Sequence, residues 1–181
     1  MREKTKTLSL PSLISVETRS IVWTASLILA VTITPAILAH TAQNQWITGV
    51  LVNTILFLAA YKVRVFNAIL VAIVPSAVAL TKGLLPLPMA MLVPYIILSN
   101  TILITIFSIF KKRILPGVIL ASLSKFLFLY LITLFVAKGL NTTLITMFQW
   151  PQLITALAGG FLALGVIKTF LTKKSFKNQN L

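Results

Sequence analysis

The chain has almost no acidic side chains and no cysteine. Glu3 and Glu17 are the two carboxylate residues among 181, and both lie near the amino terminus. General-base catalysis, proton relays and the binding of hard cations depend on carboxylates, so most classes of enzyme are excluded. The absence of cysteine also excludes disulfides and thiolate nucleophiles. We therefore expect a protein that is not an enzyme and holds no cofactor.

Histidine is equally scarce. The single histidine, His40, lies in a polar segment with Gln43 and Asn44, and no second metal ligand is nearby. This setting favours a structural or gating role in a loop over metal binding or catalysis. The chain also lacks a Gly-x-x-x-x-Gly-Lys-Ser/Thr loop, so it cannot hydrolyse nucleotides by that route. Energy for any active transport must therefore come from elsewhere.

Apolar residues dominate what remains. Hydrophobic residues make up 58% of the chain, charged residues make up 10%, and the mean hydropathy is +1.01. This composition predicts an integral membrane protein rather than a soluble domain. Apolar runs predict an all-α, polytopic fold with six transmembrane helices in one domain, residues 21–171, between an amino-terminal tail, 1–20, and a basic tail, 172–181. The predicted spans are Ile21 to Ala39, Trp46 to Ala60, Phe66 to Leu80, Leu84 to Phe110, Ile114 to Ala137 and Trp150 to Leu171.

The first apolar run has an alternative interpretation as a cleaved signal peptide. It is longer than a typical signal core and about 20 residues precede it, which favours a retained helix.

The net charge of +14 follows the predicted topology. In a soluble protein this charge would indicate nucleic acid binding. Here all but three of the 16 basic residues, Lys82, Lys125 and Lys138, fall on one side if both termini are cytoplasmic. The positive-inside rule therefore predicts cytoplasmic termini and an even number of spans, and no nucleic acid partner is implied.

Lys125 is the basic residue that topology does not explain, because it lies in the middle of the fifth predicted span. A cation at that depth is disfavoured by about 2.5–3.5 kcal/mol even on lenient insertion scales. We therefore expect its side chain to face a polar partner, a wet cavity or an anionic ligand.

Two asparagines share the predicted depth of Lys125. Spans four and five are joined by a short basic turn and should be antiparallel neighbours. At a rise of about 1.5 Å per residue, Asn100 and Lys125 both lie about 17 Å from that turn, and Asn53 lies about 14 Å above Lys62. We predict a polar cluster of Asn53, Asn100 and Lys125 that is open toward the outer side and binds a solute. The alternative is a hydrogen-bonded contact that only joins helices.

Residues nearer the outer side extend this predicted site. Pro86, Pro88 and Pro94 interrupt the fourth predicted span, and they favour a ligand-lining segment that includes Tyr95, although an ordinary kink would have the same pattern. Gln152, in the first turn of the last span, is expected to point toward the same cavity, but a solvated cap is the alternative.

Small residues predict close helix contacts. In the last span, Thr155, Gly159 and Ala163 recur at every fourth position and form a packing face. Ser26 and Ala30 in the first span have the same spacing, and this stripe could meet a helix of another protein.

These features together resemble the substrate-binding S component of energy-coupling-factor (ECF) transporters. The resemblance depends on the length, the six spans, the polar first outer loop, the small-residue stripe and three segments: Phe66-Asn67-Ala68-Ile69-Leu70, Ala79-Leu80-Thr81-Lys82-Gly83 with Pro86 and Pro88, and Trp150-Pro151-Gln152 through Gly160. These segments look like a subgroup of small prokaryotic membrane proteins.

The resemblance implies a high-affinity binder of a vitamin or micronutrient in the prokaryotic cytoplasmic membrane. Its partners would be a transmembrane coupling subunit and two cytoplasmic ATPases, with Ser26 and Ala30 in the docking stripe. The family usually has two alanines in that stripe, and this chain has one serine and one alanine. Two other functions stay open for this sequence. One is a stand-alone permease or channel, and the other is a structural or assembly subunit in which Lys125 pairs with an acidic residue of a partner.

Overall fold

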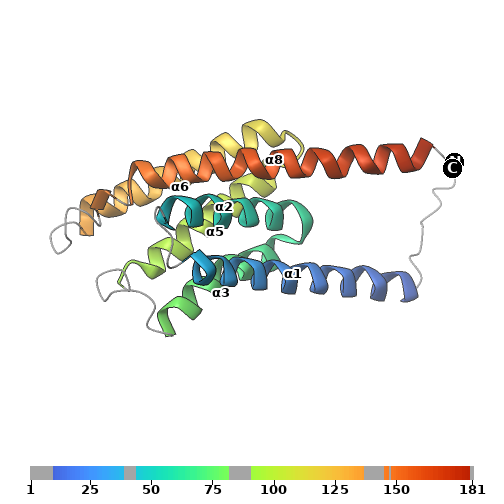
Figure 1. Cartoon of the computed structure of the whole chain (residues 1–181), viewed down its shortest axis with the longest axis horizontal. Coiled ribbons are helices and arrows are strands. Elements are labelled where there is room, and N and C mark those ends of the chain that lie inside the picture. Colours follow the sequence, from blue (N-terminus) through green and yellow to red (C-terminus); the bar gives the residue numbers. More distant parts are fainter. Residues whose placement is uncertain (1–9, 39–43, 82–90, 137–144, 147, 180–181) are drawn as a thin grey trace, which may run out of the picture.

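Six helices contain nearly all of the residues that the computed structural model describes, which are 10–38, 44–81, 91–136, 145–146 and 148–179. The predicted all-α class is confirmed for this part of the chain. In order, the helices are α1 (Leu10–Leu38), α2 (Asn44–Lys62), α3 (Val65–Thr81), α5 (Val93–Phe110), α6 (Ile114–Val136) and α8 (Trp150–Gln179) (Figure 1).

Four of these helices are long and apolar enough to cross a membrane. Their apolar stretches are Glu17–Leu38 in α1, Val93–Phe110 in α5, Ile114–Phe135 in α6 and Trp150–Thr169 in α8. The apolar parts of α2 and α3, Trp46–Lys62 and Val65–Ala77, are shorter. The structure therefore supports a helical membrane protein with at least these four candidate spans among the described residues.

The fourth predicted span begins later than the sequence indicated. The helix starts at Val93 rather than Leu84, and Pro94 lies in its first turn. Backbone N–H groups in the first turn of a helix have no acceptor within the helix, so a proline there loses no hydrogen bond. Pro94 is therefore compatible with the start of the helix and does not kink it. The prediction that Pro94 interrupts a span is wrong, whereas Pro86 and Pro88 lie outside the described residues.

The helices pack as two rows of three. One row is α1, α2 and α8, and the other is α3, α5 and α6; α1 contacts α3, α2 contacts α5, and α8 contacts α6 across the rows. The central helices α2 and α5 therefore have neighbours on most sides. This arrangement places α2, α5, α6 and α8 around one shared interior.

The basic ends of the helices lie together at one end of the molecule. The start of α1, the α2–α3 connection, the α5–α6 turn and the end of α8 all lie toward the right in Figure 1. The turn after α5 is tight, since the Arg113 amide donates to the Phe110 carbonyl at 2.8 Å. Lys62, Arg64 and the 111–113 triplet consequently occupy the same end.

The outward surface is apolar. Large side chains such as Leu29, Leu134, Phe135 and Leu162 are more than half exposed. Within the most apolar 18 residues of α1, 17% are buried, and the corresponding share is 33% in α5, α6 and α8. A surface of this kind is expected where the surroundings are lipid hydrocarbon rather than water.

The predicted packing face of the last span is confirmed. Thr155, Gly159 and Ala163 are all buried, and α8 packs closely along α2. A Cβ added at Gly159 would lie 2.6 Å from the carbonyl oxygen of Val50. Glycine is required there because the two backbones approach too closely for any side chain. The Thr54 hydroxyl, 3.1 Å from the Gly159 carbonyl, lies at the same contact.

Candidate functional site

The central polar feature is the ammonium group of Lys125. Its Nζ donates to Oδ1 of Asn53 and to Oδ1 of Asn100, each at 2.8 Å. The three side chains are 2–5% exposed. The sequence-predicted juxtaposition of these residues is therefore present, and three helices, α2, α5 and α6, meet through it.

A fourth helix holds Asn53 in place. The Asn53 amide nitrogen donates to the Gly49 carbonyl at 2.8 Å and contacts Thr155 Oγ1 of α8 at 3.5 Å. The Thr155 hydroxyl in turn donates to the Pro151 carbonyl at 2.8 Å. Reversing the Asn53 amide would turn its NH₂ toward the ammonium and its oxygen toward another carbonyl, so the network permits one orientation. Thr155 thus becomes part of the site.

Antiparallel helix geometry explains why these residues meet. The short turn between α5 and α6 fixes the two helices in register, and equal numbers of residues climb to equal heights. Asn53 lies on α2 in the other row, which contacts α5 directly, and its Oδ1 meets Lys125 Nζ at 2.8 Å. The close α2–α8 approach at Gly159 then brings Thr155, one helical turn away, beside Asn53.

Apolar clusters lie on both sides of this polar layer. Toward the basic end, Phe57 and Phe107 pack edge to face with ring centroids 5.0 Å apart, and Val118 belongs to the same cluster. Toward the opposite end, a smaller cluster contains Leu92, Leu129 and Phe148. Leu129 lies one helical turn beyond Lys125 on α6. The polar side chains are thus shielded from water along the bundle axis.

Within the described residues, no carboxylate contacts the ammonium group. Glu17 is exposed, and it lines a cavity at the basic end of the bundle, away from the polar layer. Lys125 is held by two neutral carbonyl groups, and an ammonium group has three N–H donors. A buried cation that is not paired with an anion is strongly disfavoured, so this site is chemically suited to receive an anionic group.

Ser122 adds a second unfulfilled polar group. Its hydroxyl is fully buried and has no hydrogen-bond partner within the part of the chain that the structure describes. Ser122 precedes Lys125 by about one turn of α6, so both residues lie on the buried face of that helix. The sequence analysis missed Ser122, although its hydroxyl lies one helical turn from Lys125 on the same helix. It treated Thr155 only as a small residue, because no cluster residue lies on α8 and only the packing of α8 against α2 brings Thr155 to Asn53.

The remaining predicted site residues are placed as follows. Tyr95 is half-buried and packs on the cluster of Leu92, Leu129 and Phe148 rather than on Lys125. Gln152 is half-buried in the first turn of α8, one turn before Thr155. Its role as a ligand contact, like that of Tyr95, stays a prediction.

Two residues of the predicted gating loop, His40 and Gln43, lie outside the described residues. The third, Asn44, is the first residue of α2. Ser26 and Ala30 are exposed on α1, where the predicted docking stripe would need them. No group of three or more histidine, cysteine or acidic residues that could hold a metal occurs in the described ranges.

Comparisons with protein-family models, with curated proteins and with solved structures gave no significant match. The function must therefore be argued from the site itself.

Proposed function

We propose that this chain is the membrane-embedded solute-binding subunit of an ATP-driven uptake transporter, an ECF S component, with no ATPase activity of its own. The observation that carries this proposal is the buried Lys125 ammonium, which is held by Asn53 and Asn100 without a carboxylate among the described residues. A vitamin or micronutrient with a carboxylate or phosphate would supply the missing negative charge. The orphan Ser122 hydroxyl supports the same interpretation, since it could donate to such a solute.

The proposed topology has six spans with both termini in the cytoplasm of a prokaryote. The gathering of basic helix ends at one end of the molecule supports it. The solute would then approach Lys125 from the opposite, outer end. A transmembrane coupling subunit and two cytoplasmic ATPases would supply the energy, and the exposed stripe of Ser26 and Ala30 would contact the coupling subunit.

The proposed binding mode assigns a role to each polar group. Lys125 would attract and anchor the anionic group of the solute, and the two asparagine carbonyls would hold the ammonium in position. The Thr155 hydroxyl would keep Asn53 oriented through its amide. On binding, the solute would share or replace one of the two carbonyl contacts, so that the charge stays hydrogen-bonded throughout.

The near-complete burial of the cluster favours a second candidate function. The polar layer would then join four helices of a structural or assembly subunit and bind no solute. A stand-alone permease or channel has less support, because apolar clusters lie on both sides of the polar layer.

The test is the retention of solute by the purified full-length chain. Molecules released on denaturation are identified by mass spectrometry, and their affinity is measured for Lys125→Met and for the matched exposed variant Lys112→Met. The proposal predicts one anionic solute whose affinity falls at least about 100-fold in Lys125→Met and is unchanged in Lys112→Met. Equal retention by both variants would refute the anchor role. A folded chain that captures no solute would favour the assembly subunit, and solute flux through liposomes that contain this chain alone would favour the permease.

A further inference from the structure

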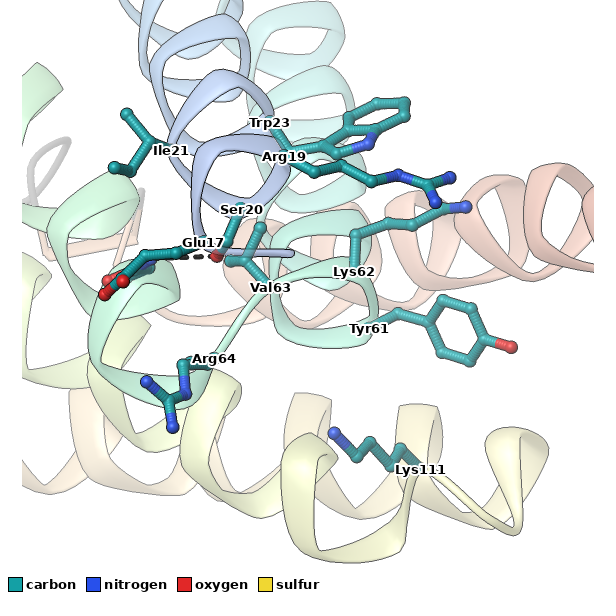
Figure 2. Close-up of a pocket in the computed structure, with 11 residues that line it drawn as sticks. Glu17, Arg19, Ser20, Ile21, Trp23, Tyr61, Lys62, Val63, Arg64 and Lys111 are labelled. Carbon is teal, nitrogen blue, oxygen red and sulfur yellow. Dashed lines mark hydrogen bonds between the residues drawn. The ribbon is translucent and has the colours of Figure 1, made fainter. Parts of the chain in front are cut away.

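A cavity of about 860 Å³ opens at the basic end of the bundle, far from the polar layer. Residues of α1, the α2–α3 connection and Lys111 after α5 form its walls (Figure 2). It therefore lies where three segments that are distant in the sequence come together. The cavity is separate from the proposed solute site, and the proposed function assigns no role to it.

The charges that line this cavity are strongly unbalanced. Arg19, Lys62, Arg64 and Lys111 contribute four cations, and among the described residues of the lining Glu17 is the one carboxylate. In Figure 2, Arg19 and Lys62 extend toward the same side of the opening, and Lys111 points toward the side where Arg64 lies. One carboxylate against four cations leaves an excess of positive charge around the opening, and a bound anion would reduce the repulsion between these cations.

The polar and aromatic groups of the cavity suit a membrane–water boundary. Lys62 Nζ lies 5.4 Å from the centre of the Trp23 ring, a cation–π contact that fixes both side chains. The Asn67 amide donates to the Ser20 hydroxyl at 3.2 Å and ties α3 to α1 beside the opening. Tyr61, also in the lining, has the amphipathic character that is enriched at interfaces.

Exposed apolar side chains lie next to lining residues in the sequence. Ile21, itself part of the lining, is 61% exposed, and Val22 and Phe66 are 59% and 71% exposed. A ligand that fits both regions has an anionic head for the basic opening and a hydrocarbon tail for the adjoining surface. A soluble anion or an acidic peptide would leave the apolar part unused.

We propose that this cavity binds the anionic headgroup of a phospholipid, with Arg19 on one side of the opening and Arg64 on the other as the main cationic groups, and with the acyl chains lying against Ile21, Val22 and Phe66. Arginine suits this role because its planar guanidinium donates two parallel hydrogen bonds to phosphate oxygens. Basic pockets between helices on the cytoplasmic side of a membrane bind such headgroups. The site is independent of the solute-binding function and requires only that the helices lie in a bilayer.

The test uses the full chain in a neutral detergent and native mass spectrometry. Dioleoylphosphatidylglycerol is titrated against dioleoylphosphatidylcholine, which has the same tails and no net charge. The site variant is Arg19→Gln/Arg64→Gln. The matched control is Lys112→Gln/Arg113→Gln, which removes the same charge at the same end from residues outside the cavity lining. Size-exclusion profiles confirm that each variant is folded.

We expect the wild type and the control to prefer phosphatidylglycerol by about tenfold or more, and the site variant to lose that preference. Glycerol 1-phosphate should not displace the lipid, since it lacks the tails. Equal weakening in the control, equal binding of both lipids, or displacement by glycerol 1-phosphate or polyglutamate would overturn the proposal. If the site variant does not fold, Lys111→Gln replaces it, with an expected loss of about threefold; an unchanged affinity in that variant would then overturn the proposal.

Discussion

The hydrogen bonds of Lys125 make an unusual prediction about stability: removing an asparagine should harm the fold more than removing the lysine. The Asn100→Leu variant deletes one charge-assisted hydrogen bond, which contributes about 1.5–3 kcal/mol, and leaves the cation buried with Asn53 as its remaining acceptor. Nothing offsets this loss, because the ammonium group is still away from water.

The Lys125→Met variant has two opposing effects. It leaves two carbonyl acceptors without their donor, at about 1–3 kcal/mol each, but it also removes a cation whose burial is disfavoured by about 2.5–3.5 kcal/mol. The middle of these ranges is a net destabilisation of about 1 kcal/mol, compared with about 2 kcal/mol for Asn100→Leu. The double variant Asn100→Leu/Lys125→Met should therefore be more stable than Asn100→Leu alone.

The assay is an unfolding titration in mixed micelles, followed by tryptophan fluorescence, for the wild type, both single variants and the double variant. We expect a coupling free energy of about 1–3 kcal/mol between positions 100 and 125. The control pair is Asn100→Leu with Lys112→Met, whose residues are far apart and should be additive. Additivity within about 0.5 kcal/mol for Asn100 and Lys125 would refute the argument that the buried charge depends on its carbonyl partners.

Three further predictions concern the packing and the topology. Gly159→Ala should lower the free energy of unfolding by about 1–3 kcal/mol in the same assay, because the new Cβ would overlap the backbone of α2. The control is Gly165→Ala, which should be neutral or slightly stabilising because the space around Gly165 is open. Ser122→Ala should stabilise the solute-free protein by about 1 kcal/mol by removing an unsatisfied buried hydroxyl, and a loss of stability would show a hidden partner. Because the chain lacks cysteine, Thr146→Cys should react with an impermeant maleimide from outside intact cells and Lys112→Cys should not; the reverse result would invert the proposed topology.

The polar cluster could be predicted from the sequence because its geometry depends on few variables. A short turn and a constant helical rise fix the relative heights of Asn100 and Lys125, whatever the surrounding side chains are. The buried positions of Thr155 and Gly159 followed similarly from their size and spacing. The positions of the residues along the helices do not determine whether the cluster binds a solute, so its solute-binding role stays a prediction.

Other features could not be obtained from composition. Leu84 to Met91 is as apolar as the helix that follows it, so hydropathy gave no reason to begin that helix at Val93. Proline is compatible with both a kink and a first turn, and the choice depends on the backbone around it. The basic cavity could not be predicted for another reason. Arg19, Arg64 and Lys111 are far apart in the sequence, and the positive-inside rule already explained their charges, so nothing indicated that they line one cavity.

The two apolar clusters on either side of the polar layer differ in the number of described residues that they contain, and this difference has a consequence for access. On the basic side, the edge-to-face rings of Phe57 and Phe107 belong to a cluster that also contains Val118, so residues of α2, α5 and α6 close this side together and it opens only if whole helices separate. On the other side, Leu92 precedes the first turn of α5 and Phe148 precedes α8, so two of the three buried side chains of this cluster in the described part of the chain lie at helix ends. Under the proposed function, a solute would therefore reach Lys125 past these helix ends, and its release at the basic end would require whole helices to move.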